Sequence, residues 1–208
     1  MPFSTDTFDK VLINHIDRLS PGRVLDIGAG SGKNGRLIRE KCSCRPKELH
    51  AIEPTKSYID IHNLHGVYDK VFCDDAVNWL KNSAENNYDL VIVTDVLEHM
   101  FKSEAFDVID SMLYRTSWLI AVWPTNLPQD ASAAIGEDYR INNPYEIHKC
   151  NLKISELASS FELQNYIKQF GWYNWNDSTR TIVEFHYAVF SGVLKRTNES
   201  LYKLKIWE

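Results

Sequence analysis

An apolar run that ends in a glycine-rich turn is the feature that most constrains the fold of this chain. The run covers residues 23–27 (RVLDI), and Gly28, Gly30 and Gly32 follow at alternate positions. Because glycine has no Cβ, such a turn can bend sharply and let a ligand lie against its backbone. Residues 33–41 have a helical pattern and would direct their free N–H groups at the same place. The stretch therefore predicts a strand, a ligand-binding turn and a helix.

The rest of the chain alternates strand-like and helix-like segments. Helices are predicted over residues 4–19, 33–41, 56–63, 76–81, 101–114 and 152–160, and strands over residues 23–27, 48–53, 67–73, 88–95, 117–123, 161–170 and 181–190. Strand–helix–strand units at this spacing form a mainly parallel sheet with right-handed crossovers. Residues 174–178, rich in Asn, Asp and Ser, would join the last two strands as an antiparallel hairpin. We therefore expect an α/β fold with a doubly wound, seven-stranded, mainly parallel sheet, an antiparallel edge strand and helices on both faces.

The composition is that of an ordinary globular protein. The 208 residues are 44% hydrophobic and 25% charged, and no apolar run approaches the ~20 residues that a membrane helix needs. The sequence opens without the pattern of a secretion signal, and its four cysteines lack paired CxxC spacing. We expect a single domain over residues 1–208, cytoplasmic, with reduced thiols and no membrane partner. The net charge of −5 argues against nucleic acid as a partner.

Acidic side chains lie at the ends of most of the predicted parallel strands. Asp26 is in the last part of the first strand, Glu53 ends the second, Asp74 and Asp75 follow the third, and Asp95 ends the fourth. Sheets of this kind bind ligands beyond the carboxyl ends of their strands. Acids at corresponding strand ends therefore predict one ligand site at one edge of the sheet.

Residues 124–149 form a long segment with little apolar periodicity after the fifth strand. Connections beyond ~12–15 residues are commonly lids or binding loops, although a tolerated insertion is the alternative. This segment leaves the sheet at the predicted binding edge. The side chains that could line a polar substrate pocket are Trp123, Asn126, Gln129, Tyr139, Asn143, Tyr145, Glu146 and His148. We expect a substrate-binding or lid loop.

The glycine turn fits two common phosphate-binding motifs poorly. A P-loop reads GxxxxGK followed by Ser or Thr, whereas this chain has Ile27 at the first position and Asn34 after Lys33. A dinucleotide fingerprint that starts at Gly28 would need glycine where Lys33 stands. A nicotinamide-dependent dehydrogenase stays open as an alternative, because it would use the same turn and Glu53.

Four motifs, in order and at the usual spacing, resemble those of class I S-adenosylmethionine-dependent methyltransferases. They are VLDIGAGSG, AIEP, DDA and YDLVIVTDVLEH, and the resemblance covers nearly the whole chain. It implies a Rossmann-like enzyme with S-adenosylmethionine as its cofactor. A noncatalytic methyltransferase-like subunit would have the same fold and is a second alternative.

The resemblance implies roles for residues of the first two strand ends. The turn residues Gly28, Ala29, Gly30 and Gly32 would approach the methionine part of the cofactor. Glu53 would hold the ribose hydroxyls, and its place about twenty residues beyond the turn spans one helix and one strand. These residues therefore form the first half of the expected cofactor site.

Acids of the other strand ends complete the expected cofactor site. Asp75 with Ala76 would read the adenine amino group and lie near its ring, with Asp74 as the alternative. Asp26 would bind loop amides or, through water, the cofactor amine, and Asp95 would lie beside the cofactor or the substrate. For each acid, the alternative role is a helix cap or a solvated turn.

Three side chains are candidates for a general base if the acceptor is a hydroxyl: His148, His99 and Asp95. His148 is preferred because it ends the long segment that would cover the pocket. Together with Glu98, these residues resemble the metal-binding set of small-RNA terminal 2′-O-methyltransferases. Those enzymes carry Glu where this chain has Asp95, and with the acidic net charge this favours a reaction without a metal. Metal-assisted RNA 2′-O-methylation remains the alternative.

The acceptor is indicated more loosely. WPTNLPQD and NPYEIHK resemble segments of methyltransferases from bacterial glycan pathways, and their amide and aromatic side chains suit a sugar hydroxyl face. We therefore expect O-methylation of a small polar acceptor such as a sugar or glycan hydroxyl. The aromatic residues Trp172, Tyr173 and Trp175 predict a stacking wall, a homodimer contact or core packing.

Overall fold

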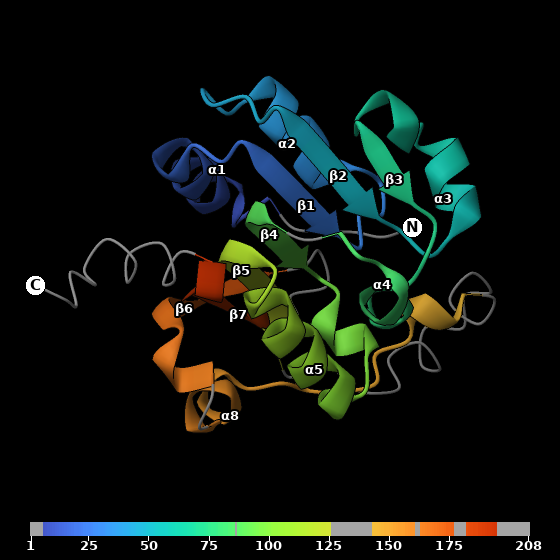
Figure 1. Ribbon diagram of the computed structural model, residues 1–208. Coiled ribbons are helices and arrows are strands. Elements are labelled where there is room, and N and C mark those ends of the chain that lie inside the picture. Colours follow the sequence, from blue (N-terminus) through green and yellow to red (C-terminus); the bar gives the residue numbers. More distant parts are fainter. Residues whose placement is uncertain (1–5, 86, 126–142, 161–162, 177–181, 195–208) are drawn as a thin grey trace, which may run out of the picture.

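The computed structural model describes residues 6–85, 87–125, 143–160, 163–176 and 182–194 (Figure 1). Its centre is a seven-stranded sheet with the order β3-β2-β1-β4-β5-β7-β6. The strands are β1 (Arg23–Ile27), β2 (Glu48–Ile52), β3 (Lys70–Phe72), β4 (Tyr88–Thr94), β5 (Thr116–Thr125), β6 (Ile167–Asn176) and β7 (Ile182–Ser191). β1 to β5 pair in parallel, and β7 runs antiparallel to both β5 and β6. The predicted fold class is confirmed.

Helices cover both faces of the sheet (Figure 1). The α-helices of the described residues are α1 (Asp9–Leu19), α2 (Lys33–Glu40), α3 (Lys56–Ile61), α4 (Ala76–Asn82), α5 (Lys102–Leu113) and α8 (Ile154–Ser159). The short 3₁₀ helices are η1 (Leu64–Gly66), η2 (Leu97–His99), η3 (Pro144–Glu146) and η4 (Leu163–Asn165). Of these helices, none is long and apolar enough to cross a membrane.

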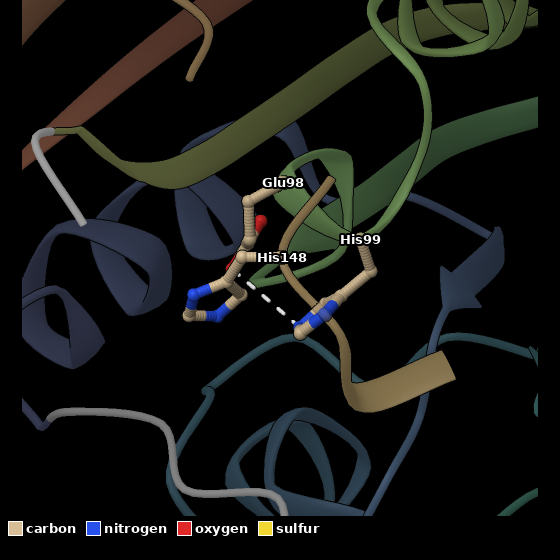
Figure 2. A group of neighbouring side chains, drawn as sticks. All are labelled: Glu98, His99 and His148. Carbon is tan, nitrogen blue, oxygen red and sulfur yellow. Dashed lines mark ion pairs between the residues drawn. The ribbon is translucent and has the colours of Figure 1, made fainter. Parts of the chain in front are cut away.

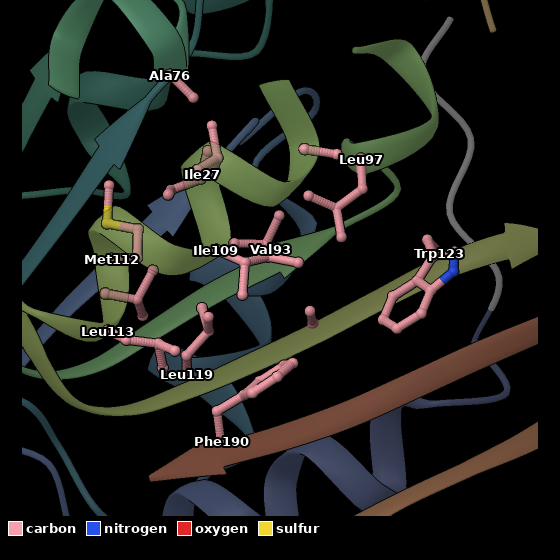
Figure 3. Packing of buried hydrophobic residues seen from close by; sticks show 14 of the residues in the cluster. Ile27, Ala76, Val93, Leu97, Ile109, Met112, Leu113, Leu119, Trp123 and Phe190 are labelled. Atoms are coloured by element: carbon pink, nitrogen blue, oxygen red, sulfur yellow. The ribbon is translucent and has the colours of Figure 1, made fainter. Parts of the chain in front are cut away.

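Alternate residues of the parallel strands pack against opposite helical layers. Ile27 of β1 and Val93 of β4 lie in one core with Ile109 and Met112 of α5 (Figure 3). Val24 of β1 faces the other side and packs in the core that contains α1 and α2. Both faces of these strands are therefore covered, which explains why their sequences are apolar throughout rather than alternating.

β3 and β6 differ most from their predicted bounds. β3 is shorter than residues 67–73, because residues 67–69 form an irregular turn between η1 and the strand and residue 73 lies beyond its end. β6 starts at Ile167 rather than at residue 161, after η4, and it runs to Asn176 through part of the predicted turn. The sixth-strand prediction was therefore wrong at both ends, because its apolar side chains also suit a short helical turn packed on the core.

β5 continues beyond the point where the long segment was expected to begin. Pro124 and Thr125 belong to the strand, and Pro124 pairs with Phe185 of β7. The pairing of β5 with β4 ends earlier, at Thr94 and Val122. Proline can therefore occupy this position without removing a hydrogen bond from the parallel ladder.

The interior of α2 is closely packed at Gly35. Its amide donates a hydrogen bond of 3.1 Å to the hydroxyl of Tyr68. A Cβ at this position would lie 2.5 Å from the Cζ of Tyr68 and 2.6 Å from the Cγ1 of Val67. Because Tyr68 is only 3% exposed, it has little room to move aside.

Replacing Gly35 by Ala should lower the free energy of unfolding by about 1–3 kcal/mol through overpacking. The sign of this change distinguishes overpacking from helix propensity, because Gly→Ala in an open helix raises the free energy of unfolding by about 0.5–1 kcal/mol. Urea denaturation measures the effect, and Glu40→Ala at an exposed position of the same helix is the control, expected to change stability by less than about 0.5 kcal/mol. A Gly35→Ala protein more stable than the wild type would contradict the close packing.

Candidate active site

A cavity of about 670 Å³ is lined by residues from the carboxyl ends of the parallel strands. The predicted site residues on its wall are Gly28, Ala29, Gly30, Glu53, Asp75, Ala76, Asp95 and His99. Four others lie next to this set in the fold without lining the cavity: Asp26, Gly32, Asp74 and His148. The fold therefore brings residues from β1, β2, α4 and β4 together as the pattern of strand ends indicated.

The glycine turn after β1 presents bare backbone to the cavity. Gly28, Gly30 and Gly32 all have positive φ angles, of 73°, 51° and 78°. A Cβ on Gly28 would collide with the side chain of Val96. The amide of Gly28 donates to the carbonyl of Ile52 at 2.8 Å, which ties the turn to the end of β2. The turn is thus fixed in a shape that only glycine adopts easily.

Glu53 stands at the end of β2 and holds the turn in place. One carboxylate oxygen accepts a hydrogen bond of 2.8 Å from the amide of Gly30, and the other accepts one of 2.8 Å from the amide of Thr55. The side chain is 4% exposed, and burial raises the pKa of its carboxyl against the opposing effect of these amides. Each oxygen keeps a further lone pair, so the carboxylate can also accept from a ligand in the cavity.

Asp26, near the end of β1, does not line the cavity. It is fully buried, and its carboxylate accepts from the hydroxyl of Tyr68 at 2.5 Å and from the side-chain amide of Asn34 at 3.0 Å. Burial raises the pKa of Asp26 to about 6, although both hydrogen bonds act in the opposite direction. Asn34 also donates to Thr94 at 2.8 Å, so the group joins β1, α2 and β4. Its partners are side chains rather than the loop amides expected from the sequence.

Asp75 caps the first turn of α4, as the alternative role foresaw. Its carboxylate accepts from the amide of Asn78 at 2.8 Å. The carboxylate of Asp74 accepts from the amide of Asp75 at 3.0 Å and from the side chain of Asn78 at 2.7 Å. Asp75 and Ala76 also line the cavity, whereas Asp74 does not. Capping therefore positions Asp75 at the cavity edge.

The chain leaves β4 through a strained residue into η2. Asp95 has a left-handed φ of 56°, and its amide donates to the carbonyl of Val122 at 3.0 Å. Glu98 follows and is 4% exposed, and burial raises its carboxyl pKa well above the usual range, with the charge of Asp95 adding to the effect. Among the described residues, its Oε2 has no hydrogen-bond partner. Such residues in unusual conformations often mark functional sites.

Residues 143–150, which we call the strap, run along the cavity and are held at both ends. The side-chain amide of Asn143 donates to the hydroxyl of Thr55 at 3.2 Å. At the other end, the amides of Lys149 and Cys150 donate to the carbonyl of Glu98 at 2.7 and 3.2 Å. Three of its side chains line the cavity: Tyr145, Glu146 and Lys149.

The strap is the described part of the predicted loop over residues 124–149. Residues 124 and 125 belong to β5, and residues 126–142, with Asn126, Gln129 and Tyr139, lie outside the described residues. The sequence named Tyr145 and Glu146 among the candidates for the pocket, and both line the cavity. It gave no signal for the contact between Asn143 and Thr55, because residues so distant in sequence meet only in the folded chain.

His99 and His148 lie side by side, with Glu98 next to them (Figure 2). Their ring centroids are 4.9 Å apart, and the Nε2 of His99 is 3.8 Å from the Oε1 of Glu98. The Nδ1 of His99 lies 3.3 Å from the carbonyl oxygen of Ile147. Since a carbonyl only accepts, this Nδ1 carries the proton, and the lone pair of the neutral ring is on Nε2.

The aromatic residues of the hairpin divide between three environments. Trp175 lines the cavity together with Val183 and Phe185. Tyr173 stacks on Phe185, with the ring centroids 5.2 Å apart and an angle of 4° between the planes. Trp172 points outward and is 64% exposed. Of this trio, only Trp175 lines the cavity, so a stacking role stays a prediction for Trp175 alone.

Comparisons with known proteins show the family and agree with the fold. A family model described as a methyltransferase domain matches residues 7–176. The N-methyltransferase NodS from Bradyrhizobium japonicum WM9 has a similar structure, with a TM-score of 0.56, 16% identity and coverage of 90% of this chain and 99% of that chain. Magnesium protoporphyrin IX methyltransferase (ChlM) from Synechocystis PCC 6803, solved with bound S-adenosylhomocysteine (SAH), has a TM-score of 0.60, 15% identity and coverage of 89% and 83%. No curated protein matches the sequence.

Replacing Asp26 by Asn should weaken the dependence of stability on pH. Because the pKa of Asp26 rises from 3.8 in the unfolded chain to about 6 in the folded one, the folded protein binds more protons between these values. The free energy of unfolding therefore falls as pH rises through this window, by at most about 3 kcal/mol from this group. Asparagine can accept from Asn34 and donate to Tyr68, so the fold should persist.

Urea denaturation between pH 4 and pH 7 measures this effect. The curve of unfolding free energy against pH should be flatter for Asp26→Asn than for the wild type. Asp60→Asn, which changes an exposed carboxyl on α3, should leave the slope as it is. Parallel profiles for Asp26→Asn and the wild type would contradict the assignment.

Proposed function

The chain belongs to the methyltransferase domain family, and from this premise we propose that it methylates a hydroxyl of a small polar acceptor, such as a sugar or a glycan. The family model spans residues 7–176, and structural neighbours from the same fold were crystallised with SAH. The protein is thus an S-adenosylmethionine-dependent methyltransferase. This membership argues against the nicotinamide-dependent dehydrogenase.

The cavity has the features that S-adenosylmethionine needs. The backbone of the turn at Gly28, Ala29 and Gly30 lines the cavity, so the methionine part could lie directly against it. Glu53 offers carboxylate lone pairs to the two ribose hydroxyls, and Asp75 with Ala76 borders the place for adenine. When bound, this cofactor supplies a methyl group on a positively charged sulfur, so that the protein has mainly to orient the acceptor and take up its proton.

The observation that carries the proposal for a hydroxyl acceptor is the imidazole of His99 on the cavity wall. Its Nδ1 proton is engaged by the carbonyl of Ile147, which leaves Nε2 as a proton acceptor. A hydroxyl loses its proton when it is methylated, and a neutral imidazole suits this task near neutral pH. The sequence preferred His148 as the base. The geometry supports His99 as the group that meets the acceptor, with His148 packed on its ring and Asp95 nearby on the wall.

The far side of the cavity supports a sugar-like acceptor. Trp175, Val183 and Phe185 add apolar surface to the wall, while Lys149 adds a hydrogen-bond donor. Sugars combine apolar ring faces with hydroxyl groups, so they can use both kinds of surface at once. The neighbours named above act on other acceptors, and at 15–16% identity they bear on the fold alone.

Release of SAH from the full chain tests the acceptor class. A panel of monosaccharides, oligosaccharides, amines and catechols would be incubated with S-adenosylmethionine, and the products would be examined by mass spectrometry and NMR. We expect turnover with sugar hydroxyls and an O-methyl product. Turnover confined to amine acceptors would overturn the proposal.

Replacing Glu53 by Ala should weaken SAH binding by about 1.5–3 kcal/mol, because two charge-assisted hydrogen bonds to the ribose are lost. Isothermal titration calorimetry measures the affinity, and thermal melting shows whether the turn still folds. Glu48→Ala is the matched control, because Glu48 is an exposed carboxylate at the opposite end of β2. Unchanged affinity in Glu53→Ala would mean that the ribose lies elsewhere.

Replacing His99 by Ala should lower kcat by about 10²-fold or more while leaving the SAH affinity of the metal-free protein within about twofold. His148→Ala should also reduce turnover far more than cofactor affinity, because the ring of His99 loses its neighbour. Steady-state kinetics with the best acceptor from the panel measures both. Full activity in His99→Ala would remove this residue as the base.

A further inference from the structure

Glu98, His99 and His148 bring three metal-ligand side chains together at the junction of η2 and the strap. One ligand atom from each of the three side chains lies within 4.8 Å of the other two, and the side chains point toward one another (Figure 2). We propose that this cluster binds a divalent transition-metal ion, which fastens the strap along the cofactor cavity. The sequence favoured a reaction without a metal, whereas the geometry leads to the opposite proposal.

The carboxylate of Glu98 supplies an independent reason to expect a cation. It is 4% exposed, and its Oε2 has no hydrogen-bond partner among the residues that the structure describes. A buried carboxylate oxygen without a partner is costly, and a metal bond would satisfy it. Asp95 and Glu146 add negative charge around Glu98. The local field therefore favours a positive ion.

The imidazole of His99 is oriented as a metal ligand. Its Nδ1 faces the carbonyl of Ile147 at 3.3 Å, and its Nε2 lies 3.8 Å from the Oε1 of Glu98. Histidines that bind metals commonly donate their other N–H to a backbone carbonyl, which fixes the ring and leaves the ligating nitrogen unprotonated. The carbonyl belongs to the residue next to His148, so one backbone segment positions both rings.

The donor set selects the class of ion. Two imidazoles and one carboxylate suit Zn²⁺, Co²⁺ or Fe²⁺ better than Mg²⁺ or Ca²⁺, which prefer oxygen ligands. Ligand atoms around a tetrahedral ion with bonds of ~2.1 Å are ~3.4 Å apart, so separations of up to 4.8 Å have to close by up to ~1.4 Å when the ion binds. Side-chain rotations on the strap and η2 can supply this movement.

Three protein ligands leave at least one coordination position for water or an acceptor. Glu98 and His99 line the cavity, so a hydroxyl in the cavity could occupy that position and lose its proton more easily. This catalytic part rests on the proposed function. An imidazole bound to the ion could not take up the proton itself, so with an ion bound His99 would hold the metal and Asp95, which also lines the cavity, would accept the proton of the hydroxyl.

Metal binding would also affect the cofactor, because of where His148 lies. The strap contacts η2 through the amides of Lys149 and Cys150, and it contacts the end of β2 through Asn143 and Thr55. Tyr145 and Glu146 line the cavity between these contacts. An ion that joins His148 to η2 would hold the strap in this position. Metal and cofactor should therefore each raise the affinity for the other.

Titration of the chelator-treated full chain with Co²⁺ tests the site without any methyl transfer. We expect a visible absorption band that saturates at one Co²⁺ per chain and disappears when Zn²⁺ is added in competition. His99→Ala and His148→Ala should lose the band, whereas His65→Ala, which removes an exposed histidine from η1, should keep it. A band of equal strength in the two cluster variants would overturn the site, as would failure of the wild type to bind Co²⁺.

A substituted ligand distinguishes metal binding from a structural role of His148. His148→Cys should restore Co²⁺ binding and add a thiolate-to-cobalt charge-transfer band in the near ultraviolet, because a thiolate is a softer ligand. Thermal melting of the metal-free variants shows that they fold. A folded His148→Cys protein without this new band would contradict ligation by residue 148.

Calorimetry with SAH tests the coupling to the strap. Zn²⁺ should raise the affinity of the wild type for SAH by roughly fivefold or more, and it should leave His148→Ala unchanged. Equal effects on both proteins would overturn the coupling. The two proposals fail separately: Co²⁺ binding without turnover of any hydroxyl would contradict the proposed function, whereas hydroxyl methylation without Co²⁺ binding would contradict the metal site.

Discussion

The buried carboxylate of Asp26 is the interaction on which the cofactor half of the site depends. It receives hydrogen bonds from Tyr68 and from Asn34, and Asn34 continues the network to Thr94. One acid thus joins the end of β1, the first turn of α2 and the end of β4, three elements that surround the glycine turn. Because Asp26 is fully buried, bulk solvent does not reach its carboxylate, and its hydrogen bonds are stronger than they would be at the surface. Glu53 completes the support by holding the amide of Gly30 from the other side.

The two halves of the site are built in different ways. The cofactor half consists of β1, its glycine turn and α2 with the ends of β2 and β4, neighbouring parallel strands whose ends the topology of the sheet brings together. The acceptor half combines η2, the strap and the hairpin of β6 and β7, which meet only in the folded chain. Contacts such as that of Lys149 with Glu98 hold it together. The residues of the acceptor half can differ between proteins that share the fold and the cofactor half. This agrees with the different acceptors named for the structural neighbours.

The parts that sequence patterns predicted are those that local physics determines. The apolar strands, the positive φ angles of Gly28, Gly30 and Gly32, and the place of Glu53 follow from backbone sterics and from the topology of a parallel sheet. The role of Tyr68 could not be read, because a tyrosine before a short strand gives no sign that its hydroxyl reaches Asp26. The start of β6 was missed for a related reason, since η4 and a strand share the same apolar composition.

His148 shows most clearly what only the fold can decide. Its place at the end of a long polar segment indicated a base above the pocket, and the sequence left a metal ligand as the alternative. In the structure its ring meets His99 and the buried Glu98, while the cavity wall is formed by His99 instead. A base needs access to the acceptor, whereas a ligand needs two or three partners at the right distance. His148 meets the second requirement better than the first, and this difference in surroundings, rather than the residue type, separates the two roles.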